Sequence, residues 1–388
     1  MVTVFRLRQA AAAVLLLSGL FPSVGTLAAK AHYEIRLLDT LDKLLAGDHQ
    51  QSLSRIQQLL IDNPDSRLGH LIHADLLAAQ AGLEKPVDAL ADESHRASLV
   101  QLRKQLTARW RFTTQLKAER TGRIPARLAT LDPSHPDLIY VDLPASRLYL
   151  YSYHDGELVV TADYYASIGR NGAGKEREGD RRTPVGIYFI TSYIPEGQLH
   201  ERYGSGALPI NYPNPLDRLK QRSGYGIWLH GTEPGWVNRS PHATDGCVSL
   251  SNRDFEAMYQ ALRQPFGTPV IIDDQPEWIT PTVQDAQHPE FTDFTRRWSD
   301  SWQRSAITTL RTFYTHPGKS ILLGKGPADG ATRLVNTVLY SYPGEPDHML
   351  AVLRFSINQD QMRTIHQYWK QQSGENWKIV SETQLDQE

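Results

Sequence analysis

The chain contains a single cysteine, Cys247, and His230 lies upstream of it with residues 231–246 between them. A thiol attacks a carbonyl carbon as its thiolate, and a nearby imidazole can take up the proton. Gly246 directly precedes the cysteine and permits backbone angles that point successive amides at one place, where they can stabilise an oxyanion. A base also needs its second nitrogen oriented, and the Gly231 carbonyl is a candidate. These residues predict a cysteine nucleophile with a histidine base.

Two other interpretations of Cys247 stay open on the residues alone. A free cysteine is often a small buried hydrophobic group, and the only cysteine of an exported chain cannot form an internal disulfide. The second alternative is a metal site, whose ligand types would come from His230, His242, Asp245 and Cys247. Their spacing matches no common zinc pattern, so we expect neither a metal nor a cofactor.

Strands must position the thiol and the imidazole. His230 follows a predicted strand at 226–229, and Cys247 precedes another at 248–251. The ends of neighbouring strands can bring two side chains together although the sequence separates them.

A period of two extends over the surrounding sequence and predicts a mostly antiparallel β domain at 137–273. Its predicted elements are strands at 138–142, 147–151, 158–168, 185–191 and 270–272, with a helix at 253–262. The glycine-rich segment 169–182 fits no phosphate-binding fingerprint, so we interpret it as a flexible turn.

The start of the chain has the order of a secretory signal. Arg6 and Arg8 precede an apolar run at 10–20, and small residues follow. The run is shorter than the roughly 20 residues that span a bilayer. We predict an exported, periplasmic protein whose signal peptide is 1–29, with retention as an uncleaved anchor as the alternative.

The next segment, 30–122, shows apolar residues at helical spacing throughout. Its part at 53–82 resembles one tetratricopeptide-type helix pair, in which Asn63-Pro64-Asp65-Ser66 breaks the helical pattern and offers a cap for the next helix. A helical spacer and a partner-docking surface are both compatible with this pattern.

A third domain is predicted at 290–388, after a proline-rich and acidic linker. Phe291, Phe294, Trp298 and Trp302 lie on one face of an amphipathic helix. Predicted strands follow at 332–342, 349–357, 362–368 and 377–382. Helices before an antiparallel sheet indicate an α+β cone-like domain, so the whole chain of 388 residues is a multidomain α+β protein. Lys+Arg 41 against Asp+Glu 43 gives no charge signature for nucleic acid.

Two motifs resemble a known family. His-Gly-Thr at 230–232, followed by Thr-Asp-Gly-Cys-Val-Ser at 244–249, resembles the active-site signature of the L,D-transpeptidase catalytic domain, or YkuD domain. Thr-Pro-Val-Gly-Ile-Tyr at 183–188 is similar to that family's Thr-Pro-x-Gly-x-Phe strand. The resemblance covers about 137–273. It implies Cys247 as nucleophile, His230 as base, the Gly231 carbonyl as orienting group, and the amides of Gly246 and Cys247 as oxyanion hole.

The chain departs from the family after and before the cysteine. The family usually has Ser-His-Gly-Cys, where this chain has Asp245 in place of the histidine, and it often has Arg or Asn where this chain has Ser249. The absent arginine removes a carboxylate contact, which Arg182, Arg239 or Arg253 can supply instead. Candidate substrate-binding residues are Arg182, Tyr225, Trp236, Thr244, Asp245 and Ser249. Tyr203 is a further groove candidate, whereas Trp228 is expected in the core.

Residues 290–388 resemble the nuclear-transport-factor-2-like domain fused to cell-shape-determining L,D-carboxypeptidases, where it is associated with dimerisation or substrate capture. The resemblance implies peptidoglycan stem peptides as substrate, with a protein acceptor and a homodimer through 290–388 as further partners. Three hypotheses follow. An L,D-transpeptidase releases D-alanine from tetrapeptide stems and passes the thioester to an amine, an L,D-carboxypeptidase passes it to water, and a non-catalytic module only binds peptidoglycan.

Overall fold

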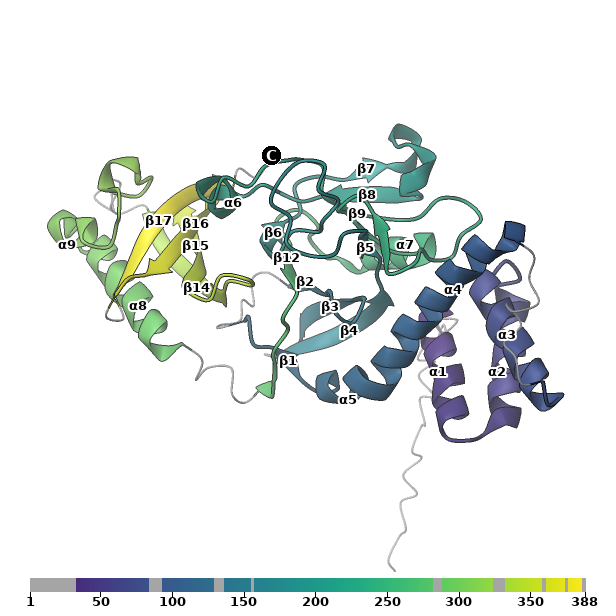
Figure 1. Ribbon diagram of the computed structural model, residues 1–388. Helices are drawn as coiled ribbons and strands as arrows, with labels where there is room; N and C mark the ends of the chain where they lie inside the picture. Colours follow the sequence, from purple (N-terminus) through teal and green to yellow (C-terminus); the bar gives the residue numbers. More distant parts are fainter. Residues whose placement is uncertain are drawn as a thin grey trace, which may run out of the picture. The chain divides into compact units, whose positions relative to one another are not determined.

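The computed structural model describes residues 33–83, 93–128, 136–154, 157–281, 288–323, 332–357, 361–373 and 376–385. These segments lie in one compact unit, Tyr33–Glu388, shown in Figure 1. The predicted signal at 1–29, the turn residues Asp155 and Gly156, and most of the linker before 288 lie outside the described residues. In the part of the chain that is described, no helix is long and apolar enough to cross a membrane.

The predicted helical region is confirmed. It consists of α1 (Tyr33–Leu45), α2 (His49–Asp62), α3 (Arg67–Gln80), α4 (Glu93–Arg111), a π-helical turn (Phe112–Leu116) and α5 (Lys117–Arg120). The cap predicted within 63–66 is Ser66, whose side chain accepts a hydrogen bond from the Gly69 amide at the start of α3. Leu37, Ile56 and Leu59 are buried in a core of their own within this region.

Two sheets build the central domain. The larger has the strand order β4-β3-β2-β12-β6 and the smaller β11-β9-β8-β7. The larger sheet's strands are β2 (Asp137–Asp142), β3 (Arg147–His154), β4 (Glu157–Tyr165), β6 (Gly186–Phe189) and β12 (Pro269–Asp273). The smaller sheet's strands are β7 (Ile194–Pro195), β8 (Gly206–Pro209), β9 (Trp228–His230) and β11 (Val248–Ser249). One buried cluster contains Ile139 and Val270 of the first sheet and Leu229 of the second, so the two sheets share a core.

The pairing is antiparallel except at a few places that matter for the site. β12 runs parallel to β2 in the larger sheet, and β11 runs parallel to β9 in the smaller one. A short parallel pair joins β5 (Ile168–Gly169) to β10 (His242–Thr244). The domain also contains two short helices, α6 (Pro215–Leu219) and α7 (Asn252–Ala261). A separate two-stranded sheet pairs β1 (Ile124–Pro125) with β13 (Trp278–Ile279).

Some strand ends differ from the predicted ones for local reasons. The strand before His230 begins at Trp228 rather than 226, because Gly226 has a φ of +69°. The strand after Cys247 ends at Ser249, since the Ser251 hydroxyl accepts from the Asp254 amide and starts α7. The strand predicted at 158–168 is divided, because the amide of Ala166 turns back to the carbonyl of Ser146.

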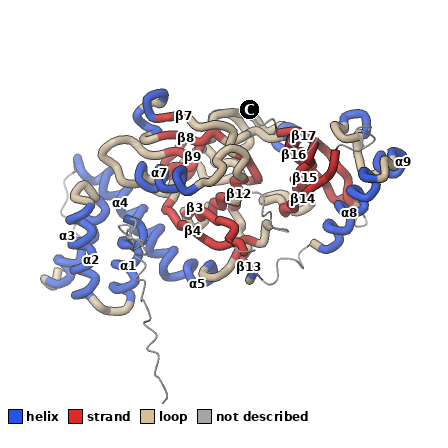
Figure 2. Tube along the Cα trace, turned by 180° about the vertical axis from the view of Figure 1, so that it is seen from behind, coloured by secondary structure: helices blue, strands red, loops and turns tan. Residues whose placement is uncertain are grey.

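The C-terminal segment has helices followed by an antiparallel sheet, as predicted (Figures 1 and 2). It contains α8 (Pro289–Gln303), α9 (Ile307–Arg311), β14 (Thr332–Ser341), β15 (His348–Ile357), β16 (Gln361–Gln371) and β17 (Trp377–Leu385). Trp298 and Trp302 of α8 are buried against Trp369 of the sheet. Residues on the other face, including Tyr342, join a cluster with Ile187 of the central domain.

Candidate active site

His230 lies at the end of β9 with 1% of its surface exposed. Its Nδ1 is 2.6 Å from the carbonyl oxygen of Gly231, so the carbonyl fixes the ring with Nε2 directed away from this bond. Burial and, to a lesser extent, the positive charge of Arg239 together lower the pKa of His230 to about 3. The imidazole is therefore neutral near pH 7 and able to accept a proton.

Cys247 directly precedes β11, whose parallel pairing sets Val248 opposite Leu229. Its Sγ donates to the Gly226 carbonyl over 3.4 Å. Burial raises the pKa of the thiol to about 11, although the Trp228 backbone N–H and Arg239 favour the thiolate. The resting site thus holds a neutral thiol and a neutral imidazole at the ends of two adjacent strands.

The turn before the cysteine requires glycine. Gly246 has a φ of +128°, and a Cβ there would lie 2.8 Å from the Arg182 carbonyl oxygen. Its amide donates to Thr244 Oγ1 over 3.1 Å, and that hydroxyl donates to the Cys247 carbonyl over 2.7 Å. The Cys247 amide has no acceptor among the described residues. The turn therefore leaves the Cys247 N–H available to an oxyanion while Thr244 occupies the Gly246 N–H.

A second network fixes the carbonyl that orients the base. Ser249 Oγ donates to the Gly231 oxygen over 2.8 Å. Asn252 Oδ1 accepts from the amides of Thr232, at 2.8 Å, and Ser205, at 3.1 Å. A Cβ on Gly231 would lie 2.1 Å from this Oδ1, so glycine is needed for the loops to approach. Asn252 was not among the predicted site residues, since nothing local in the sequence indicates which loops its side chain joins.

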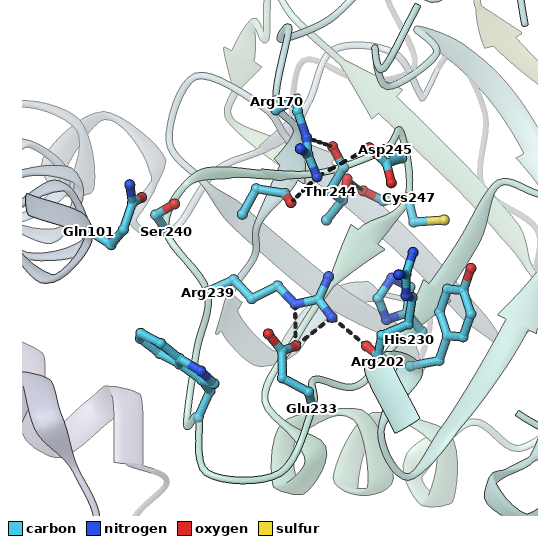
Figure 3. Close-up of a pocket in the computed structure, with 13 residues that line it drawn as sticks. Gln101, Arg170, Arg202, His230, Glu233, Arg239, Ser240, Thr244, Asp245 and Cys247 are labelled. Atoms are coloured by element: carbon cyan, nitrogen blue, oxygen red, sulfur yellow. Dashed lines mark hydrogen bonds and ion pairs between the residues drawn. The ribbon is translucent and has the colours of Figure 1, made fainter. Parts of the chain in front are cut away.

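Thiol and imidazole open into one cavity of about 440 Å³. Figure 3 shows the residues around it. They are Gln101, Arg170, Arg202, Tyr203, His230, Glu233, Trp236, Arg239, Ser240, Ala243, Thr244, Asp245 and Cys247. The cavity is therefore polar and rich in arginine, and one of its residues, Gln101, comes from the helical region.

The charges of the cavity are mostly paired. Arg239 Nη2 lies 2.5 Å from a Glu233 oxygen, and Arg170 Nη2 lies 3.2 Å from an Asp245 oxygen. Figure 3 shows these pairs on opposite sides of the cavity. Arg202 has no carboxylate within ion-pair distance in the described part of the chain. It is the arginine best placed to meet an anionic ligand.

The predicted site residues divide into two groups. Trp236, Thr244 and Asp245 line the cavity with Cys247 and His230, as does Tyr203. The other predicted substrate contacts do not line it, and these are Arg182, Tyr225, Ser249 and the alternative Arg253. The surroundings of Arg182, Tyr225 and Ser249 explain why their side chains lie outside the cavity.

Arg182 turns its carbonyl toward Gly246 while its guanidinium donates to the Ala173 carbonyl. Tyr225 is 76% exposed on the surface, and Ser249 is buried behind Gly231. His242, the metal alternative, is exposed and lies 3.4 Å from the Gly169 carbonyl. In the described residues the cavity groups nearest the thiol form no metal-ligand cluster.

The site brings a thiol, an oriented imidazole and a glycine turn to one cavity, and groups of these kinds can carry out acyl transfer through a thioester. Residues 136–272 match the family model described as the L,D-transpeptidase catalytic domain, YkuD. The chain therefore carries a catalytic domain of the YkuD family, as its motifs indicate.

Two solved structures share the wider fold. Bd1075 from Bdellovibrio bacteriovorus is 22% identical with a TM-score of 0.54, covering 68% of this chain and 99% of its own. The helical cell shape determining protein Pgp2 from Campylobacter jejuni is 20% identical with a TM-score of 0.51, covering 68% and 96%. At these identities the likeness concerns the fold alone. No curated protein sequence matches the chain.

Proposed function

We propose that the chain is a peptidoglycan-modifying L,D-transpeptidase that releases D-alanine from tetrapeptide stems through a thioester at Cys247. The observation that carries the proposal is the 2.6 Å contact between His230 Nδ1 and the Gly231 carbonyl, in a YkuD domain and beside the only thiol of the chain. A base held by a carbonyl in this way is suited to take the proton of a thiol.

The proposed reaction begins from the neutral pair. As the carbonyl of the diaminopimelate–D-alanine bond approaches, the thiol proton passes to His230 Nε2 and Sγ attacks the carbonyl carbon. The Cys247 amide stabilises the oxyanion, and the Gly246 amide joins it if Thr244 rotates away. His230 then returns the proton to the departing D-alanine nitrogen. The thioester is attacked by an amine, from another stem or from a protein, with His230 as base.

A second candidate, an L,D-carboxypeptidase, is favoured by the size of the cavity. Its volume of about 440 Å³ lies toward the lower end of the range of ligand sites, roughly 300–1,000 Å³. Once a stem peptide fills such a cavity, water reaches the thioester more easily than a second stem does. The similarity to Pgp2, named as a helical cell shape determining protein, supports a role in cell shape for either reaction.

The remaining expectations belong to the same proposal. Export to the periplasm fits a cell-wall substrate and rests on the motif at 1–29. Residues 290–388 are proposed to act as a nuclear-transport-factor-2-like domain in dimerisation or substrate capture. The domain division 30–122, 137–273 and 290–388 is likewise proposed from the sequence.

The test incubates the purified protein with disaccharide tetrapeptides and identifies the products by mass. Tripeptide with free D-alanine supports the carboxypeptidase, whereas 3–3 cross-linked dimers support the transpeptidase. The Cys247→Ala variant should release no D-alanine. Turnover that persists in this variant would contradict both reactions, and binding without turnover in the wild type would favour the non-catalytic module.

A further inference from the structure

The loop of residues 233–243, called here the active-site loop, connects the strand of His230 to that of Cys247. Glu233, Trp236, Arg239, Ser240 and Ala243 all line the cavity. Little of this loop is secondary structure, since only its last residues belong to β10. Other parts of the chain must therefore determine where its side chains lie.

Helix α4 of the helical region holds the middle of this loop at Asn238. Gln105 Nε2 donates to the Asn238 carbonyl over 3.2 Å, and Arg109 Nη2 donates to its Oδ1 over 3.0 Å. Asn238 is 4% exposed, and its Nδ2 has no hydrogen-bond partner among the described residues. Asn238 therefore accepts two buried hydrogen bonds from α4, one through its side-chain oxygen and one through its backbone carbonyl.

The helical region contacts the loop at two more places. The guanidinium of Arg67, on α3, lies 4.5 Å from the ring centroid of Trp236. Trp236 and Val237 pack against the apolar core of the helical region. Figure 3 shows Gln101 of α4 at the edge of the cavity next to Ser240. The helical region thus contributes Gln101 to the lining of the cavity and packs behind the active-site loop, which lines the same side.

Buried charges fix α4 on the central domain. Glu34 of α1 lies between Arg109 of α4, at 2.8 Å, and Arg147 of β3. Arg147 also pairs with Asp163 of β4 at 2.7 Å. The side chains of Glu34, Arg109 and Arg147 are at most 2% exposed. Separating the helices from the domain would leave buried charges without partners, which is costly.

The next residue of the loop, Arg239, links this attachment to the chemistry. Its carbonyl accepts from Tyr165 and Ser167 at 3.1 Å each, and its side chain is held by Glu233. Its charge acts on both His230 and Cys247. Asn238 and Arg239 are consecutive, so the hydrogen bonds from α4 to Asn238 also constrain the backbone that carries Arg239.

We propose that the helical region is a wall of the substrate cavity, and that Gln105 and Arg109 are positioning residues that hold Arg239 in place through Asn238. This inference rests on the proposed function for its effect on turnover. It assigns the region a part in the site itself, rather than the role of a spacer.

The experiment compares full-length variants. Asn238→Leu keeps the side-chain volume but removes the acceptor, whereas Asn238→Asp retains it. Gln105→Leu removes the bond to the loop backbone. Arg103→Gln is the matched control, because Arg103 lies on α4 and pairs with Asp75 of α3 at 2.9 Å within the helical region.

Two quantities are measured. Amide hydrogen exchange of 236–239 should accelerate in Asn238→Leu and Gln105→Leu and stay unchanged in Arg103→Gln. The kcat/KM for D-alanine release should fall on the order of tenfold in Asn238→Leu and remain near wild type in Asn238→Asp and Arg103→Gln. The double variant with Arg239→Gln should be no worse than the poorer single variant, because both changes act through one side chain.

Each outcome decides the proposal. Unchanged exchange at 236–239 would show that α4 does not hold the loop. Faster exchange with unchanged kcat/KM, additive losses with Arg239→Gln, or an equal loss in Arg103→Gln would overturn the positioning role. If the wild type releases no D-alanine, the proposed function fails, while the exchange data still decide whether the helices hold the cavity wall.

Discussion

The hydroxyl of Ser249 donates a 2.8 Å hydrogen bond to the carbonyl oxygen of Gly231. The same oxygen lies 2.6 Å from His230 Nδ1, so it accepts from both groups at once. The parallel register of β9 and β11 brings this about, because it sets Ser249 opposite His230. Ser249 stands where the family often has arginine or asparagine. Its side chain contacts the carbonyl that orients His230 and does not line the cavity.

Replacing Ser249 by alanine should lower kcat with little change in KM. Loss of one neutral hydrogen bond costs about 0.5–1.5 kcal/mol, which corresponds to roughly two- to tenfold in rate. Steady-state D-alanine release measures both constants. Ser152→Ala is the control, since Ser152 is a buried serine of the same domain that donates to Asp137 at 2.8 Å, away from the cavity. A raised KM at constant kcat would instead indicate a substrate contact.

The pH dependence of thiol reactivity should be that of a neutral pair. Burial, with a smaller contribution from the negative charge of Asp245, raises the pKa of Cys247 to about 11 despite the favourable charges of Arg239 and Lys175. His230, with its pKa lowered to about 3, is a neutral imidazole near neutral pH, so no imidazolium charge stabilises the thiolate there. Iodoacetamide should therefore label the protein about tenfold faster for each pH unit between 7 and 10, because the thiolate fraction grows at that rate.

The labelling is specific, because Cys247 is the only cysteine, and Cys247→Ala gives the blank. A rate that reaches a plateau between pH 5 and 8 would show a thiolate–imidazolium pair in the resting enzyme. That result would contradict the neutral pair described here.

The sequence was sufficient to predict that the side chains of His230 and Cys247 share one site, and both line the same cavity. Strand signals predicted a strand before His230 and another after Cys247, and the structure has β9 and β11 there. The parallel register sets Ser249 opposite His230, so Cys247 lies at the other end of this short pair, and both side chains line one cavity. Local patterns also predicted the flanking regions. These patterns are the helical spacing, the capping segment 63–66 and the aromatic face of α8. These features depend on local pattern, which a single sequence displays.

The walls of the cavity depend on contacts between distant segments, which no local pattern displays. Gln101 and Arg202 enter it from elements far from the motif. Arg182 is close in space to Gly246, yet its carbonyl makes the approach. Proximity in the fold was thus predictable for Arg182, whereas the direction of its side chain was not.

Arg202 should supply the carboxylate contact that the sequence assigned to other arginines. It lines the cavity, whereas Arg170 and Arg239 are each paired with a carboxylate there. A charged hydrogen bond contributes about 1.5–3 kcal/mol. Arg202→Gln should therefore reduce kcat/KM for a tetrapeptide stem by roughly 10- to 100-fold. The same change should matter little for a stem whose terminal D-alanine is a carboxamide.

Arg253→Gln serves as control, because Arg253 is exposed and outside the cavity. The measurement is kcat/KM for both substrates in all three proteins. If Arg202→Gln weakens the acid and the carboxamide equally, Arg202 does not recognise the carboxylate.

Glu34 should be essential for the stability of the joined helical and central regions in a pH-dependent way. Burial alone raises the pKa of Glu34, but Arg109 and Arg147 outweigh it and hold this pKa below its ordinary value. Such a carboxylate stabilises the fold above its unfolded pKa of about 4.3, and the contribution is lost as the pH falls through the lower folded pKa. Glu34→Gln leaves two buried guanidiniums underpaired, at a cost of about 3–5 kcal/mol near neutral pH. Thermal unfolding should therefore show a lower Tm for Glu34→Gln than for wild type at pH 7, and this difference in Tm should narrow below about pH 4.

The control is Glu93→Gln, which alters only an exposed pair with Arg96 and should leave Tm unchanged. Equal Tm for wild type and Glu34→Gln at pH 7 would mean that this carboxylate does not hold α1 and α4 on the central domain.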